Sequence, residues 1–415
     1  MRPGRFAATD IAVSDALSAI LPTSEQTWLL QACLHTGEAA RQAWRAYRAK
    51  VDDVTGWLRN DRSNVKSLMP LLFLALQRNE IVVEKELFRF LRIAYLRETL
   101  RARTYRGILR DVLQVLSRND VPHIVLKSPA LAETVYEDPA LRHCDDINLL
   151  LAERDRASAA SLLSRGGFAR GSQGLPSGIG PLTLIHESGL PLHLHTHLLC
   201  APPFSLPVAD LWGRSQHRLI LGVPTRLLAP SDNLLHVCVH AAFYSGRESP
   251  RWASDAWYTL TQDPDLNWDA LCKCAIAQSL ALPLYVTLRY LAVDLQAAVP
   301  GPVLDRLLVG VSETDAIRSQ ATLVLALGGT GGIVNLLTRV GSGWRSRALV
   351  VRWMLFPSPS YMRSTFQAGH SWLLPIYYIY RPLRYIARRM LWRFADHVKR
   401  RAAPSTITAQ VRPGE

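Results

Sequence analysis

Residues 125–151 read VLKSPALAETVYEDPALRHCDDINLLL, and this stretch decides the fold. It joins two short runs, the apolar residues 122–126 and residues 145–151, whose lengths are typical of strands. Between the runs, residues 128–136 have the look of a helix. This change of period predicts a small unit in which strands and helices alternate.

The unit continues along the chain. Residues 153–167 are predicted to form a helix that ends at a Gly-Gly pair, because glycine is favoured just after a helix. Residues 181–188 and 190–199 flank Gly189, which predicts a β-hairpin. We therefore expect a compact α+β block over residues 121–200.

Helices are predicted on both sides of this block, with Ser24 and Ser231 as expected N-caps. They lie in residues 24–34, 65–77 and 84–116 before the block, and in residues 231–244, 252–261, 268–280 and 282–297 after it. The fold class is therefore α+β, with a small mixed-sheet core embedded in a mainly helical protein. We expect four parts, namely an N-terminal helical region (1–120), an α+β core (121–225), a helical domain (226–338) and a C-terminal helical segment (339–415).

The composition excludes several protein classes. Hydrophobic residues make up 48% of the 415 residues and charged residues 20%, which is enough apolar material for folded cores and excludes wholesale disorder. The six cysteines do not form a disulfide framework, so we expect a reducing, cytoplasmic location. Cys272 and Cys274 have no second pair, which argues against a structural zinc site.

Positive charge is concentrated near the C-terminus. Residues 339–401 hold thirteen Lys or Arg against one acidic residue, Asp396, in a chain whose net charge is +14. Aromatic residues are interleaved with these arginines, which suits an anionic membrane surface. The alternative is that the arginines lie on the surface of ordinary helices, and we do not expect a nucleic acid partner.

No membrane-spanning or signal segment is predicted. Asp10 and Asp15 stand where the apolar core of a signal peptide would lie. Residues 319–338 carry no charge, but glycines interrupt them, so we expect two short buried helices joined by a glycine turn. The expected location is the cytoplasm, with peripheral contact at the inner face of the membrane as an option.

The order and spacing of residues in the block resemble the uncharacterised nucleotidyltransferase family of bacteria, within the polymerase-β-like superfamily. The matching positions are Leu126, Lys127, Ala130, Leu131, Tyr136, Asp138, Pro139, Arg142, Asp146, Ile147, Gly167 and Phe168. The helical half adds Leu235, His236, His240, Ala241, Arg251, Trp252 and Asp255. The resemblance covers about residues 60–300, and Ser128 replaces a glycine of the family pattern. It implies a nucleotidyltransferase-like core that uses a divalent metal and a nucleoside triphosphate.

The resemblance also implies an acidic metal site, because metal ions stabilise the attacking and leaving oxygens of nucleotidyl transfer. The first carboxylate is Asp146, while Asn148 and His193 occupy the other two acidic positions. Asp145 is expected to point away from Asp146, since adjacent strand residues face opposite sides. Asp146 and Asn148 are thus the candidate catalytic pair, and the loss of two carboxylates weakens a two-magnesium site.

Histidines offer a second set of ligands. His193, His195 and His197 alternate along one strand and share a face, so they could bind Mn²⁺ or Zn²⁺ in place of Mg²⁺. The alternative is a polar, half-exposed strand face. The candidate metal ligands are therefore Asp146, Asn148, His193 and His195, with an orienting role as the other option for His195.

Three residues are candidates for nucleotide binding. Lys127 ends a strand, where its ammonium could meet a triphosphate. Ser128 could offer its hydroxyl and N–H to phosphate, or act as a simple N-cap. Arg142 could hold phosphate bidentately, or form an ion pair with Glu137 or Asp138.

A histidine pair lies in the helical half. His236 and His240 are four residues apart on one predicted helix and could join Asp255 at a metal, but the apolar surroundings favour satisfied core histidines. Arg251, Trp252 and Asp255 could instead pack their helix against the block.

Three functions from different classes follow. The first is a transferase that moves a nucleotidyl group onto a small molecule or peptide. The second is a degenerate member of the family that binds a nucleotide or partner without catalysis, which the two lost carboxylates favour. The third is a peripheral membrane or scaffold protein in which the α+β block is only structural.

Overall fold

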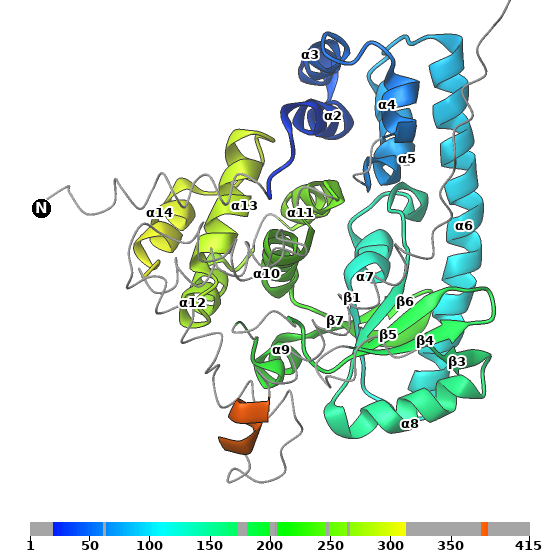
Figure 1. Cartoon of the computed structure of the whole chain (residues 1–415), viewed down its shortest axis with the longest axis vertical. Coiled ribbons are helices and arrows are strands. Elements are labelled where there is room, and N and C mark those ends of the chain that lie inside the picture. The colour runs from blue at the N-terminus through cyan, green and yellow to red at the C-terminus, as the bar shows by residue number, and fades with distance from the viewer. Residues whose placement is uncertain are drawn as a thin grey trace, which may run out of the picture. The chain divides into compact units, whose positions relative to one another are not determined.

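The computed structural model describes residues 20–60, 64–171, 181–199, 204, 206–245, 249–263, 266–312 and 375–380. Its regular elements up to Val309 belong to one compact unit, shown in Figure 1. The expected division into four parts stays a prediction. The glycine-interrupted stretch 319–338 and most of residues 339–415 lie outside the described residues.

Seven strands form one mixed sheet in the order β3-β4-β5-β2-β1-β7-β6. Their bounds are β1 (Ile124–Leu126), β2 (Ile147–Leu150), β3 (Phe168–Arg170), β4 (Leu182–His186), β5 (Pro191–His195), β6 (Gln216–Ile220) and β7 (Val223–Leu227). Strand β1 pairs antiparallel with β2 and parallel with β7, and β2 pairs parallel with β5. The predicted α+β class with a mixed sheet is confirmed.

Strands β1 and β2 are buried on both faces, which explains why their sequences are mostly apolar, with Asn148 as the polar exception. Ile124, Leu126 and Leu150 face the larger helical core, while Val125 and Leu149 face a second core on the other side of the sheet. This alternation follows from the two-residue period of a strand. Both strands and the hairpin β4–β5 agree with the sequence prediction.

Strands β3, β6 and β7 were not predicted. The edge strand β6 is mostly exposed and its sequence, QHRLI, lacks a clear apolar alternation. Its hairpin with β7 turns at Leu221 and Gly222, both with positive φ, as a two-residue turn of the hairpin type requires.

The helices are α2 (Ser24–Leu34), α3 (Gly37–Arg48), α4 (Val54–Asn60), α5 (Met69–Arg78), α6 (Lys85–Arg118), α7 (Lys127–Thr134), α8 (Glu153–Ser164), α9 (Val208–Arg214), α10 (Pro230–His240), α11 (Arg251–Gln262), α12 (Trp268–Ala277), α13 (Ala281–Val293) and α14 (Gly301–Val309). The predicted helices are confirmed, but two predicted caps are wrong. Thr23, in a capping box with Gln26, caps α2 in place of Ser24. Helix α10 begins at Pro230, with Ala229 as its N-cap residue.

Helix α6 links the two cores. Its N-terminal half buries Leu87 and Leu91 in the helical core, and its C-terminal half buries Leu109 and Leu113 against the sheet. It also packs beside the short 3₁₀ turn η2 (Pro139–Leu141), which leads into β2. Helix α6 therefore fixes the position of the loop that carries the acidic residues.

Two sequence expectations can be checked on the part of the chain that the structure describes. None of the described helices is both long and apolar enough to cross a membrane. The five cysteines in the described ranges are free thiols, and four of them are buried.

Candidate functional site

A cleft of about 210 Å³ opens where the sheet meets the helical core. It lies at the end of β1 and the start of β2, and α7, α10 and α11 complete its walls. The polar residues in its lining are Lys127, Ser128, Arg142, Asp145, Asp146, His236, His240, Ser249, Arg251, Trp252 and Asp255. Both halves of the sequence motif thus meet at one cavity.

Lys127 stands at the sharp turn from β1 into α7. Its φ of 54° lies in the left-handed region, which residues other than glycine rarely adopt because the backbone is strained there. The turn sends the chain directly from a buried strand into a helix and places Lys127 in the cleft wall. Ser128 is buried inside the first turn of α7, so the prediction that it is a simple N-cap is wrong.

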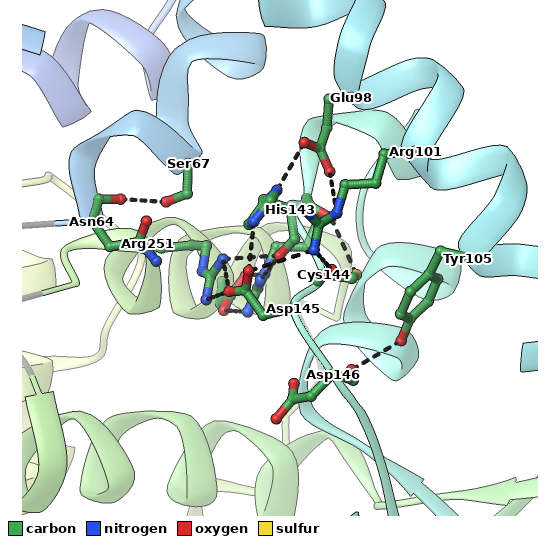
Figure 2. A network of polar contacts seen from close by, with 12 residues as sticks. Asn64, Ser67, Glu98, Arg101, Tyr105, His143, Cys144, Asp145, Asp146 and Arg251 are labelled. Carbon is green, nitrogen blue, oxygen red and sulfur yellow. Dashed lines mark hydrogen bonds and ion pairs between the residues drawn. The ribbon is translucent and has the colours of Figure 1, made fainter. Parts of the chain in front are cut away.

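The acidic edge lies on β2 and its neighbour β5. Asn148 pairs in register with His193, which brings these two positions side by side. Asp146 precedes β2, and its Oδ2 lies 3.6 Å from Nε2 of His193. Figure 2 shows Asp145 and Asp146 pointing in different directions, as expected for neighbours along an extended chain.

Asn148 has no solvent-exposed surface. Its Oδ1 accepts a hydrogen bond of 2.8 Å from Nε2 of His195, and its amide nitrogen has no partner. Burial, and next the charge of Lys127, lowers the pKa of His195 well below its usual value, so this imidazole is neutral. The side-chain oxygen of Asn148 is therefore already used within the protein.

The structure brings together Asp146, Asn148, His193 and His195, as the resemblance implied. His193 is positioned on its other side by Thr183, whose hydroxyl lies 3.0 Å from Nδ1. His197 lies beyond the end of β5 and contacts Thr196. Within the described ranges, no group of three or more His, Cys, Asp or Glu residues could hold a metal ion.

Arg142 forms an ion pair with the carboxylate of Asp255. Its Nε and Nη2 donate to Asp255 at 2.6 and 2.7 Å, and both side chains are buried. Burial opposes the charge on Arg142, but Asp255 outweighs it and raises the pKa further above its usual range. The sequence predicted an ion pair of Arg142 with Glu137 or Asp138 as the alternative to phosphate binding. Arg142 does form an ion pair, but its partner is Asp255 on α11. Tyr136 also donates to Asp255, at 2.8 Å.

A second polar network lies between α6 and the acidic loop (Figure 2). His143 contacts Glu98 at 2.7 Å and Asp145 at 2.6 Å, and Arg251 lies 3.4 Å from Asp145. Burial lowers the pKa of His143, but its hydrogen bonds to Asp145 and Glu98 have the larger combined effect and raise it. Burial raises the pKa of Asp145, but His143 and the nearby arginines lower it far below its usual value.

The sequence alone does not indicate this network. Glu98 and Arg101 are two of many charged residues on a long helix, and nothing in their spacing indicates a partner some 45 residues away. His143 adjoins the motif but matches no position of it. The alternative in which Arg251 and Asp255 pack their helix against the block is confirmed, because both residues contact its acidic loop.

The expectation of satisfied core histidines fails at His236. This side chain is 1% exposed, and neither ring nitrogen has a hydrogen-bond partner. Its ring lies 5.6 Å from that of His240, edge to face. Burial, and then the charge of Lys127, lowers the pKa of His240 to about 3, so both rings line the cleft in the neutral state.

The chain is thus an α+β protein whose mixed sheet carries a lysine at one strand end and a carboxylate at the start of the next strand, both in the lining of one cleft. A family model described as uncharacterised nucleotidyltransferase matches residues 61–295, which is more than half of the chain. The chain therefore belongs to this family, and its function is nucleotidyltransferase-like. No curated protein and no solved structure matches it.

Proposed function

We propose that the cleft binds a nucleoside triphosphate and transfers its nucleotidyl group to a small-molecule or peptide acceptor. In this reaction an acceptor oxygen forms a bond to the α-phosphorus, and pyrophosphate leaves. The observation that carries the proposal is that Lys127 and Asp146 line one cleft of about 210 Å³ in a chain of this family. A cation for phosphate and a carboxylate for metal are thus in reach of one ligand.

Phosphate binding falls to Lys127, Ser128 and the first turn of α7. The ammonium of Lys127 can neutralise phosphate charge, and the free N–H groups of a helix start favour anions. Arg142 has a different role in the proposal. Because its guanidinium already donates to Asp255 through Nε and Nη2 and to the carbonyl oxygen of His143 through Nη1, it positions α11 beside the cleft and leaves phosphate contact to Lys127.

The donor set at the acidic edge fits a softer divalent cation. Asp146 supplies a carboxylate and His193 an imidazole nitrogen, a combination that suits Mn²⁺ or Zn²⁺ better than a pair of Mg²⁺ ions. A proton on Nδ1 of His193, donated to Thr183, would leave Nε2 free as a ligand. Asn148 and His195 are hydrogen-bonded to each other, and in the proposal they position the two ligands and do not bind the metal. A bound cation would supply charge neutralisation at the α-phosphate.

A second candidate function is nucleotide binding without transfer. The hydrogen bond from His195 to Asn148 favours it, because it removes the second acidic position of the family pattern from the metal site. A site with one carboxylate can still bind a nucleotide but stabilises the charge of the transition state less well.

Isothermal titration calorimetry tests the proposal, with ATP, GTP, CTP or UTP in the presence of Mg²⁺, Mn²⁺ or Zn²⁺. We expect metal-dependent binding that Asp146→Ala abolishes and that Asp305→Ala, an exposed change on α14, leaves intact. No binding with any combination, or equal binding by Asp146→Ala, would contradict the proposal.

Asn148→Asp separates the two candidate functions. The new carboxylate keeps the acceptor for His195 Nε2, so the local structure has its partner. Release of pyrophosphate that rises in this variant indicates a weakened transferase. Nucleotide binding with no turnover in either protein supports the binding function.

A further inference from the structure

The outer side of α6 carries an exposed apolar line. Ile93, Leu96 and Leu100 are 44%, 49% and 63% exposed, and their spacing of three and four places them on one face. The buried residues of the same helix, such as Leu91 and Leu109, lie on the opposite face. Large aliphatic side chains in a row on a solvent-facing helix indicate a surface that contacts something.

Arginines flank this line on both sides. Arg89, Arg92, Arg97, Arg103 and Arg110 are all exposed, and no ion pair links them to a carboxylate in the described part of the chain. By helical geometry Arg92, Arg103 and Arg110 lie to one side of the aliphatic line and Arg97 to the other. These five arginines with Ile93, Leu96 and Leu100 are called the outer face of α6.

The exposed charged residues of this face between residues 89 and 110 are arginines, and the exposed acidic residues Glu86 and Asp111 lie just beyond its two ends. The one acidic residue of that stretch, Glu98, has a side chain that is 12% exposed and bound to His143. The face extends over about 30 Å of helix at 1.5 Å per residue. Figure 1 shows α6 at one edge of the compact unit, with α4 and α5 on its inner side.

We propose that the outer face of α6 docks on an anionic lipid surface. Ile93, Leu96 and Leu100 enter the boundary between headgroups and acyl chains, and the flanking arginines contact lipid phosphates. Long arginine side chains suit this arrangement, because they can lie along the aliphatic line and still reach the headgroup charges. The proposal is independent of the nucleotide site.

Two other occupants fit the face less well. A second copy of the chain would bring arginines against arginines, and like charges at close range repel. A nucleic acid would meet three aliphatic side chains in the middle of the contact, where aromatic stacking platforms are found in such proteins. An anionic membrane offers phosphates to the arginines and acyl chains to the aliphatic side chains.

The test is sedimentation of the full chain with vesicles of phosphatidylcholine alone or with 30% phosphatidylglycerol. One variant carries Leu96→Ser and Leu100→Ser, and another carries Arg92→Glu and Arg103→Glu. Matched controls carry Leu219→Ser with Val309→Ser, and Arg165→Glu with Arg170→Glu, which are exposed positions on other elements. Circular dichroism checks that each variant is folded.

We expect the unaltered chain to bind the anionic vesicles and not the neutral ones. Both α6 variants should lower the vesicle partition coefficient by about tenfold or more, and both controls should keep it. Unchanged binding by the α6 variants would overturn the proposal and assign the contact to another basic region such as residues 339–401. Absence of vesicle binding, or an α6 effect seen only on oligonucleotide binding or dimer formation, would also overturn it.

Discussion

Removal of Asp255 should destabilise the protein strongly. In Asp255→Ala the Arg142 guanidinium, 6% exposed, loses the carboxylate that accepts two of its hydrogen bonds at 2.6 and 2.7 Å. Breaking a buried pair by removing one partner costs about 3–5 kcal/mol, because the remaining charge stays buried without compensation. Loss of the hydrogen bond from Tyr136 adds about 1 kcal/mol. We therefore expect the free energy of unfolding to fall by about 4–6 kcal/mol.

A double-mutant cycle shows whether this cost comes from the pair. Arg142→Met and Asp255→Leu remove one charge each, and the double variant replaces the pair by apolar groups. Because the double variant leaves no unpaired charge, it should be more stable than either single variant, with a coupling energy of at least about 2 kcal/mol.

Urea unfolding of the full chain, followed by far-ultraviolet circular dichroism at pH 7, measures these differences. Asp305→Ala, an exposed change, serves as the control and should stay within about 0.5 kcal/mol of the unaltered protein. A cost below about 1 kcal/mol for Asp255→Ala, or additive effects of the two single variants, would refute the buried pair.

Two further predictions concern Lys127 and His240. The Lys127→Gly variant should be more stable than the Lys127→Ala variant by about 1 kcal/mol. Both variants lose the ammonium group, but only glycine adopts a φ of 54° without strain. Equal midpoints of urea unfolding for the two variants would contradict this. The folded pKa of His240, about 3, lies below the unfolded value of about 6.5, so the unfolded state takes up the proton first. Stability should therefore fall as pH drops from 6.5 to 5, by up to about 1.4 kcal/mol per pH unit, and His240→Gln should reduce that slope. A slope unchanged in this variant would show that other groups are responsible.

The centre of the sheet could be predicted from the sequence because burial on both faces leaves a strong local signal. The runs at Ile124–Leu126 and Ile147–Leu150 contain few polar residues, and Gly189 marks the hairpin between β4 and β5. The edge hairpin of β6 and β7 could not be predicted in this way. Its outer strand faces solvent, so neither a continuous nor an alternating apolar pattern was required of it.

The same distinction applies to the site. The grouping of Asp146, Asn148, His193 and His195 follows from strand periodicity and one pairing register, both of which the motif implies. The partner of Arg142, Asp255, lies 113 residues away in the sequence. Glu137 and Asp138 are much nearer in the sequence and were equally plausible partners. Which carboxylate wins depends on how α11 packs, and that information is not local.

The two departures from the acidic pattern are physically related. Asn148 is fully buried and His195 is neutral, so an ionised carboxylate at position 148 would be a buried charge facing an uncharged imidazole. The amide avoids this cost and keeps the hydrogen bond. At position 193 a neutral histidine likewise reduces the negative charge around Asp146. With Lys127 in the same cleft, such a site would repel the phosphates of the proposed nucleotide less than three carboxylates would.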